Sequence, residues 1–541
     1  MTRTSPFKSS VRHSVLPPLP RTTGRPAREC GNEPCTISTQ TPVTIVRGEC
    51  SGLPRRAALQ RHGRKSVVRG LQKESLRNPL LGWTSLIVVL VATISYLTIG
   101  TAIAQERKNF SIPKDLTAKL KVKVAYNSNE VFFRFEWPSE SKGYLHDYLR
   151  FKGDKWVKTP GSSVGPHPLK LYEDRVSFLL DDGGVRYFDS AGGYVTIHER
   201  MRFLSNQSPK GEVQKHPYLG ARRKKTDVRK YNPETRKSGR WEDVVSEAEL
   251  KRLKKNGVFL DLWMWRGHRG NPIGAVDDMW IHEYRNGDKG KSAYTTNWDK
   301  KKNQPRFMYD PEKTGFYALK WDDVINFRLT QKDIYFLSYN NAKPFDPSHN
   351  WKEGDTLPRR YLRPPEGSRG DITGSGVWED GSWHVDMRRL LNTGNDDDKQ
   401  LQDQRRYTIA FAIHKNYNGS RWHHISFPKS LGMGVEADIM AQRFSGETPP
   451  WDKIRWNSLT LYYPGQVTWE WLISSEHAGA AKVKNGQACA TCHTAELMGK
   501  YSVEHEIRDD LKERWKMTTI SGSIFIFGLA LAGLIAARRS D

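Results

Sequence analysis

The sequence predicts a mainly β protein, with a β-sandwich domain followed by a short helical segment and a C-terminal transmembrane helix. Apolar and polar side chains alternate in residues 121–126, and Val131, Phe133 and Phe135 share one face of the next strand. Asn, Asp, Gly and Pro separate many such short segments, which is typical of a sandwich. Residues 517–537 contain no charged side chain and are long enough to cross a bilayer.

The strands of the predicted sandwich lie within residues 106–470. Residues 121–126 and 131–137 form a predicted hairpin, because the sequence between them favours a turn. The strand predicted at residues 407–414 has one face of large side chains and one face of small ones. Helical patterns are few and cover residues 247–255, 489–500 and 503–516.

Two uncharged apolar segments predict the topology. Residues 78–105 can cross a bilayer and end in Ala102-Ile103-Ala104, so a cleaved signal peptide and a retained N-terminal anchor both fit. Residues 517–537 are followed by Arg538 and Arg539, which predicts a cytoplasmic C-terminus. We therefore expect a location in the cytoplasmic (inner) membrane, with the large domain in the periplasm.

The 541-residue chain is strongly basic, with 86 Lys and Arg residues against 60 Asp and Glu, a net charge of +26. Residues 1–77 form a basic leader that we expect to be disordered and that need not belong to the mature protein. A basic run at residues 210–240 is either a solvated loop or a docking patch for an acidic redox partner. Nucleic acid is not an expected partner for a domain outside the cytoplasm.

Cys489, Cys492 and His493 form a C-x-x-C-H motif, the attachment signature of c-type haem. Two thiols one helical turn apart add to the vinyl groups of the porphyrin, and the adjacent His donates a ring nitrogen to the iron. A redox dithiol would be expected in a βαβ setting, and a zinc site would need two further ligands at suitable spacing. The motif therefore predicts covalent haem c in a segment spanning residues 471–516.

The distal ligand of this haem stays open. Too little chain follows the motif for the small helical cytochrome domain. The candidates are Met498, His505 and His477, although Met498 lies so close to His493 in sequence that we expect it on the same side of the ring. The large domain could supply the ligand instead, or the iron could be five-coordinate.

Several short motifs of the large domain occur together in one known family. They are Tyr126-Asn127 with residues 131–137, residues 172–176, residues 261–266 with Asp277-Asp278, residues 383–390, and residues 407–412. The chain resembles, over roughly residues 115–430, the haem-binding (gamma) subunit family of ethylbenzene dehydrogenase. The resemblance implies a β-sandwich haem-binding domain with one haem b between two axial side chains. Such a domain relays electrons for molybdenum enzymes or within related membrane-linked chains and does not itself catalyse substrate chemistry.

The resemblance also suggests where haem b would be held. Residues 192–201 match a family segment and contain His198, with Met201 as a second possibility because the family also uses Met. His423 and His424 lie at the other end of the domain and point to opposite faces of a strand, so only one of them can be a ligand. His423 shares its face with apolar neighbours, which suits a buried site. The family's Lys ligand has no clear counterpart.

Two acidic segments, Asp277-Asp278 and residues 395–398, carry adjacent carboxylates. They are either solvated loop residues or ligands of a structural cation.

The predicted function is that of a membrane-anchored periplasmic c-type cytochrome. It would transfer electrons between a redox enzyme or quinone-linked complex and another carrier, with haem b as an additional centre. The expected partner is a redox protein or a respiratory or photosynthetic membrane complex, including a molybdenum enzyme. No carboxylate pair, nucleophile triad or phosphate loop stands out, so a non-catalytic role is expected. The alternatives are a haem-dependent oxidoreductase and a haem protein that senses redox state or a gas.

Overall fold

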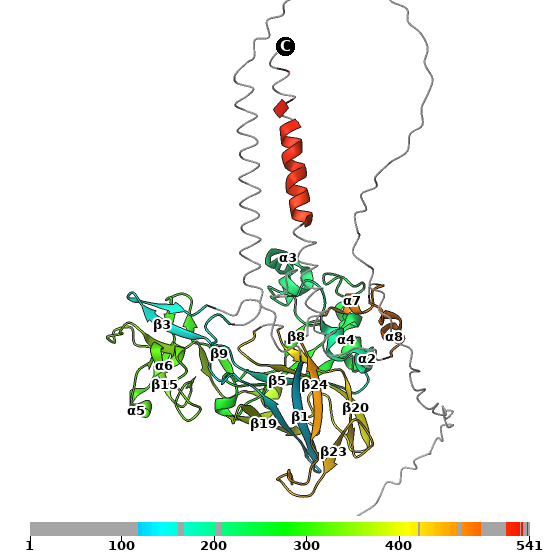
Figure 1. Cartoon of the computed structure of the whole chain (residues 1–541), viewed down its shortest axis with the longest axis horizontal. Helices are drawn as coiled ribbons and strands as arrows, with labels where there is room; N and C mark the ends of the chain where they lie inside the picture. The colour runs from blue at the N-terminus through cyan, green and yellow to red at the C-terminus, as the bar shows by residue number, and fades with distance from the viewer. Residues whose placement is uncertain are drawn as a thin grey trace, which may run out of the picture. The chain divides into compact units, whose positions relative to one another are not determined.

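A computed structural model describes most of the large domain and part of the C-terminal region (Figure 1). The described residues are 117–160, 167–201, 207–419, 422–463, 467–475, 477–487, 515–530, 532, 533 and 538. The predicted leader (1–77), the N-terminal apolar segment (78–105) and the C-x-x-C-H motif lie outside these residues.

The main sheet contains 13 strands within the described residues. These strands are β1 (Thr117–Tyr126), β2 (Glu130–Pro138), β5 (Arg175–Asp181), β6 (Leu260–Arg266), β7 (Asp277–Ile281), β8 (Arg285–Gly287), β18 (Thr373–Glu379), β19 (Ser382–Leu390), β20 (Arg405–His414), β21 (His424–Ile425), β22 (Lys429–Met433), β23 (Ile439–Arg443) and β24 (Asn457–Tyr462). Hydrogen bonding runs in the order β18-β19-β2-β1-β23-β22-β20-β5-β6-β7-β8. In addition, β24 pairs with β1 and β21, and β21 pairs with β20.

The sandwich prediction is wrong, because the central strands of this sheet close on themselves. The strands β1, β23, β22, β20, β21 and β24 each pair with the next, and β24 pairs back to β1. The closing contacts join segments far apart in sequence, such as Leu120 with Leu459 and Ile425 with Tyr462. A sandwich consists of two separate sheets, whereas these six strands form one closed cycle. Side chains alternate in the same way in both arrangements, so alternation could not distinguish them.

The predicted hairpin is confirmed. Strands β1 and β2 pair in antiparallel fashion, with Tyr126 opposite Val131. The side-chain oxygen of Asn127 closes the turn, because it accepts hydrogen bonds from the backbone N–H groups of Asn129 and Glu130.

The helix predicted at residues 247–255 is also confirmed as α4 (Glu247–Lys255). Its N-cap Ser246 accepts a hydrogen bond from the Glu249 N–H, and Leu250 and Leu253 are buried. The other helical segments are α2 (Phe188–Ala191), η1 (Gly192–Thr196), α3 (Lys210–Lys215), η2 (Pro217–Arg222), η3 (Pro233–Thr235), η4 (Asn271–Ile273), α5 (Pro311–Thr314), α6 (Trp321–Ile325), η5 (Gly367–Gly370), α7 (Trp469–Leu472) and α8 (Ala480–Lys484).

Smaller sheets are formed by strands inserted between those of the main sheet. They are β3 (Tyr148–Lys152), β4 (Lys155–Lys158), β9 (Tyr294–Thr296), β10 (Trp298–Asp299), β11 (Gln304–Pro305), β12 (Phe307–Tyr309), β13 (Leu319–Lys320), β14 (Leu337–Ser338), β15 (Ala342–Pro344), β16 (Asp355–Pro358) and β17 (Arg360–Leu362).

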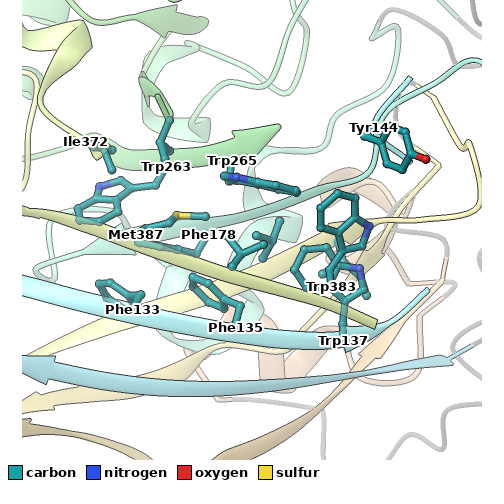
Figure 2. Packing of buried hydrophobic residues seen from close by; sticks show 14 of the residues in the cluster. Phe133, Phe135, Trp137, Tyr144, Phe178, Trp263, Trp265, Ile372, Trp383 and Met387 are labelled. Atoms are coloured by element: carbon teal, nitrogen blue, oxygen red, sulfur yellow. The ribbon is translucent and has the colours of Figure 1, made fainter. Parts of the chain in front are cut away.

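One face of the main sheet carries an aromatic core (Figure 2). The ring of Phe178 lies 4.7 Å from that of Phe133 and 4.9 Å from that of Trp263, measured between centroids. Trp137 and Trp383 stack across β2 and β19 with their centroids 6.2 Å apart. Each fully buried Phe of this kind contributes roughly 1.5–3 kcal/mol through removal of apolar surface from water. The core therefore holds β2, β5, β6 and β19 together and leaves the other face of β5 and β6 for a different use.

The predicted C-terminal transmembrane helix is not supported. The helical residues described near the C-terminus are 515–530, 532, 533 and 538. Nowhere in the described part of the chain is a helix both long and apolar enough to cross a membrane. This finding contradicts the transmembrane prediction for residues 517–537. It also contradicts the predicted inner-membrane location with a periplasmic domain and a cytoplasmic C-terminus.

Candidate cofactor cavity

A cavity of about 470 Å³ lies against the second face of β5, β6 and β20. Ser177, Met264 and Ala412 occupy register-matched positions on these three strands, and all three line the cavity. Ala410 lies two residues before Ala412 and lines the cavity as well. The space exists because β20 presents small side chains on this face and large ones to the aromatic core. This is the division into a small and a large face that the sequence of β20 predicts.

Several side chains able to bind haem iron line the cavity, among them Met201, His414 and His423, with His146 and Met264 as further His and Met residues of the lining. The rings of His414 and His423 stack with their centroids 4.6 Å apart and their planes 11° apart. Met201 is buried, and its sulfur accepts a hydrogen bond of 2.9 Å from the backbone N–H of His198. That bond fixes the sulfur at the wall of the cavity.

The cavity carries a large excess of positive charge. Its lining includes seven arginines and one lysine: Arg175, Arg229, Arg266, Arg269, Arg285, Arg359, Arg360 and Lys230. Burial, together with Arg229 and Arg266, lowers the pKa of Arg285 to about 9. A partly buried guanidinium whose pKa is lowered in this way is stabilised in its charged form by an anionic ligand.

Two buried carboxylates partly balance these arginines. Glu173 accepts a 2.6 Å hydrogen bond from Arg269 Nε, and Asp277 accepts one of 2.7 Å from Arg266 Nη2. Burial would raise the pKa of Glu173, but Arg269, Arg175 and Arg266 hold it well below its usual range. The arginines are thus held in place from behind, and the cavity remains positive.

A sequence model of the ethylbenzene dehydrogenase family matches residues 94–426, which is more than half of the chain. The chain belongs to the ethylbenzene dehydrogenase family. This finding agrees with the resemblance seen in the motifs of the large domain.

Short stretches of the chain are similar to two bacterial cytochromes. It is 47% identical to cytochrome c-551 of Rhodocyclus tenuis over 45 residues, which are 8% of this chain and 18% of that protein. It is 40% identical to cytochrome c-552 of Stutzerimonas stutzeri over 47 residues, which are 8% of this chain and 16% of that protein. The chain therefore spans less than a fifth of the length of either cytochrome.

The structure separates the four side chains considered for haem b in this family member. Met201 and His423 line the cavity, whereas His198 and His424 do not. The ring nitrogens of His198 lie 2.6 Å from Glu470 Oε1 and 3.0 Å from the Tyr231 carbonyl oxygen. The His198 ring thus lies outside the cavity, while its backbone N–H donates to the Met201 sulfur. The alternation of β21 turns His424 away from the cavity.

The segment leading to the C-x-x-C-H motif packs against the residues next to Met201. The Trp469 N–H donates a 2.6 Å hydrogen bond to the Ile197 carbonyl, and Glu470 holds His198. Val483 of α8 is buried in the same hydrophobic cluster as Met201. His477, a distal-ligand candidate, has its Nδ1 2.7 Å from the Leu472 carbonyl oxygen, and burial lowers its pKa.

The other predicted residues of the c-haem segment lie outside the described residues. They are Cys489, Cys492, His493, Met498 and His505. Their roles remain predictions.

Sequence reasoning missed His414 and the arginine set. His414 ends the small face of β20, so the run of small residues before it was a usable signal. The arginines come from positions between 175 and 360 and are brought together by the fold, so no local motif marks them. They could be found only by knowing which strands are neighbours.

Proposed function

We propose that this chain is a two-haem electron-transfer cytochrome, with haem b in the cavity and haem c on Cys489 and Cys492. The observation that carries the proposal is the cavity itself, which combines iron-binding side chains with an excess of arginine in a member of the ethylbenzene dehydrogenase family. The short similarities to cytochromes c support the second centre.

The cavity residues fit haem b in size, polarity and charge. A volume of about 470 Å³ falls within the roughly 300–1,000 Å³ of cofactor pockets. The sheet supplies an apolar wall through Leu262, Met264 and Ala412, and the arginines supply partners for two propionates. Met201 and His423 are the residues that would hold the iron, and bound haem would supply reversible one-electron exchange.

The C-terminal segment would bring the second haem close to the first. It packs beside Met201 through Trp469, Glu470 and Val483, and Cys489 follows Gly486 by three residues. His198 joins the two regions, because its side chain holds Glu470 and its N–H holds the Met201 sulfur. Electrons would pass from one haem to the other and on to a redox partner. Family membership points to a molybdenum enzyme as that partner.

The test is a haem count on the full chain, purified from cells that mature c-type cytochromes. Acid–acetone extraction followed by a pyridine haemochrome assay separates the two classes, because covalent haem c stays with the polypeptide. We expect one retained haem c and one extracted haem b per chain. A chain without retained haem would overturn the haem c assignment, and one without extracted haem would overturn the haem b assignment.

Paired variants test the axial ligands. Met201→Leu and His423→Gln should remove the low-spin spectrum of haem b and open its iron to carbon monoxide. The matched controls Met264→Leu and His424→Gln should keep the wild-type spectrum, since Met264 lines the cavity without being an assigned ligand and His424 lies outside it. A wild-type haem b that already binds carbon monoxide would favour the alternatives of a haem-dependent oxidoreductase or a redox- or gas-sensing haem protein.

A further inference from the structure

A cluster of buried carboxylates lies on the other face of β6 and β7 from the cavity. Asp277 and Asp278 are consecutive on β7 and therefore point to opposite faces. Asp277 pairs with Arg266 and Arg369, whereas Asp278 lies among other carboxylates. One oxygen each of Asp261, Asp278 and Asp398 lies within 4.8 Å of the others.

Asp278 is fully buried, and neither of its oxygens has a hydrogen-bond donor among the described residues apart from the carboxyl group of Asp288. Asp288, just after β8, is 5% exposed, and its oxygens likewise lack other donors within the described residues. Asp261 Oδ1 is buried without a hydrogen-bond partner in that same part of the chain. Buried oxygens in native proteins are almost always satisfied, so this cluster calls for a further partner.

The charge of the cluster is also unbalanced. Arg389 is the cation bonded to it in the described part of the chain, and its Nη1 lies 2.8 Å from both Asp261 Oδ2 and Asp398 Oδ1. The nearby Lys399 points its ammonium group away, toward Asp181 and Asp182. Arg389 thus pairs with two of the four carboxylates, and within the described residues Asp278 and Asp288 have no cation bonded to them. Buried unpaired charge costs several kcal/mol per ion.

Two forms of neutralisation are available, protons and a metal ion. Burial together with Asp288 and Asp261 raises the pKa of Asp278 well above its usual range. Burial with Asp261 and Asp397 raises the pKa of Asp288 to about 9. A bound cation would remove the repulsion between these groups without protonating them.

We propose that Asp261, Asp278, Asp288 and Asp398 bind a calcium ion. Calcium takes six to eight oxygen ligands at roughly 2.3–2.6 Å, so oxygens on opposite sides of the ion are up to about 5 Å apart. Three of the carboxylates have oxygens within 4.8 Å of one another, close enough to share one ion. Magnesium usually keeps several waters and is bound by only one or two carboxylates, so a set of four carboxylates favours calcium.

The proposed ion would join segments that are distant in sequence. Asp261 begins β6, Asp278 lies on β7, Asp288 follows β8, and Asp398 belongs to the acidic segment at residues 395–398. The opposite face of β6 forms the cavity wall. Calcium at this cluster would therefore stiffen that wall from behind, independently of the haems.

The test is metal content and thermal unfolding of the full chain after dialysis against a chelator and after addition of excess calcium. We expect one calcium per chain by elemental analysis, and calcium should raise the Tm by several degrees. Asp278→Asn and Asp288→Asn should each lose this calcium and its effect on Tm. The control Asp396→Asn should keep both, because Asp396 is exposed and pairs with Lys254 and Lys289.

Three outcomes would overturn the proposal. The first is a wild-type Tm that neither calcium nor the chelator changes, as expected if protons neutralise the cluster. The second is an Asp278→Asn variant that keeps the wild-type calcium content. The third is an equal or larger increase in Tm with magnesium, which would exclude the assignment to calcium. If Asp278→Asn does not fold, the wild-type titration and the Asp288→Asn variant still decide.

Discussion

The two faces of β6 and β7 carry opposite charge. The cavity face gathers seven arginines around a space of about 470 Å³. The other face gathers three carboxylates within 4.8 Å of one another, two of which pair with Arg389. Strand β7 contributes a residue to each face. Asp277 pairs with Arg266 on the cavity side, and Asp278 belongs to the carboxylate cluster on the other side. Alternation of side chains thus separates an arginine-rich face from a carboxylate-rich face by the thickness of one sheet.

A second pair of consecutive acidic residues also has one member beside the arginines and one away from them. Glu173 and Asp174 are consecutive and fully buried. The arginines hold the pKa of Glu173 well below its usual range, whereas burial raises the pKa of Asp174 to about 7. The pKa values of Asp277 and Asp278 likewise shift in opposite directions, down for Asp277 and up for Asp278. The direction of each shift is decided by whether the carboxylate faces the arginines of the cavity, so each pair marks a boundary of the positive region.

Removing the cation of the carboxylate face should have the largest effect. Arg389→Met leaves Asp261 and Asp398 buried without their guanidinium, so the free energy of unfolding should fall by about 3–5 kcal/mol. Urea denaturation followed by tryptophan fluorescence measures the change. The adjacent Arg388 has an exposed side chain that donates to Thr373 Oγ1, so Arg388→Met should change stability by less than about 0.5 kcal/mol. Equal effects of the two variants would show that the cluster does not depend on its guanidinium.

Removing a cation from the cavity face should act on the cofactor instead. Arg285→Met should weaken retention of haem b by about 10–100-fold, the value of one charge-assisted hydrogen bond to a propionate. Transfer of haem b to an excess of an apoprotein acceptor measures the loss, and haem c in the same sample serves as the concentration standard. Arg306→Met is the control, because Arg306 is exposed and does not line the cavity. If haem b leaves the Arg285→Met variant no faster than it leaves the wild type, Arg285 does not bind a propionate.

The local parts of this arrangement were predictable from sequence, and the long-range parts were not. The hairpin at Asn127 and the small face of β20 follow from neighbouring residues alone. The same alternation rule separates His423 from His424. The closed cycle depends on pairings such as Leu120 with Leu459, which leave no local signature.

In the candidate site, too, local features could be predicted from the sequence and long-range contacts could not. His198 looked like a ligand because it sits in a family segment, but a contact with Glu470, 272 positions away, engages its ring. The acidic segments at Asp277-Asp278 and residues 395–398 were each visible in the sequence. Only the fold shows that Asp278 and Asp398 meet while Asp277 turns away.

A pH dependence of stability is expected at Asp174, beside the arginine-rich region. Asp174 accepts hydrogen bonds from Ser139, Ser141 and Trp383, yet burial raises its pKa from 3.8 to about 7. Between about pH 4 and pH 7 the folded chain therefore binds a proton that the unfolded chain has lost. Stability contributed by this group falls as the pH rises through that range, by about 1.4 kcal/mol per pH unit, and levels off above it.

Asp174→Asn should remove this slope, because an amide does not titrate. The measured quantity is the difference in unfolding free energy between variant and wild type, followed by urea denaturation across the range, so that titrations shared by both proteins cancel. That difference should shift in favour of the variant as the pH rises to about 7. Asp154→Asn changes an exposed turn residue between β3 and β4 and is the matched control for the substitution itself. A pH-independent difference for Asp174→Asn would mean that its three hydrogen bonds outweigh burial and that Asp174 is already ionised in the folded chain, as Glu173 is.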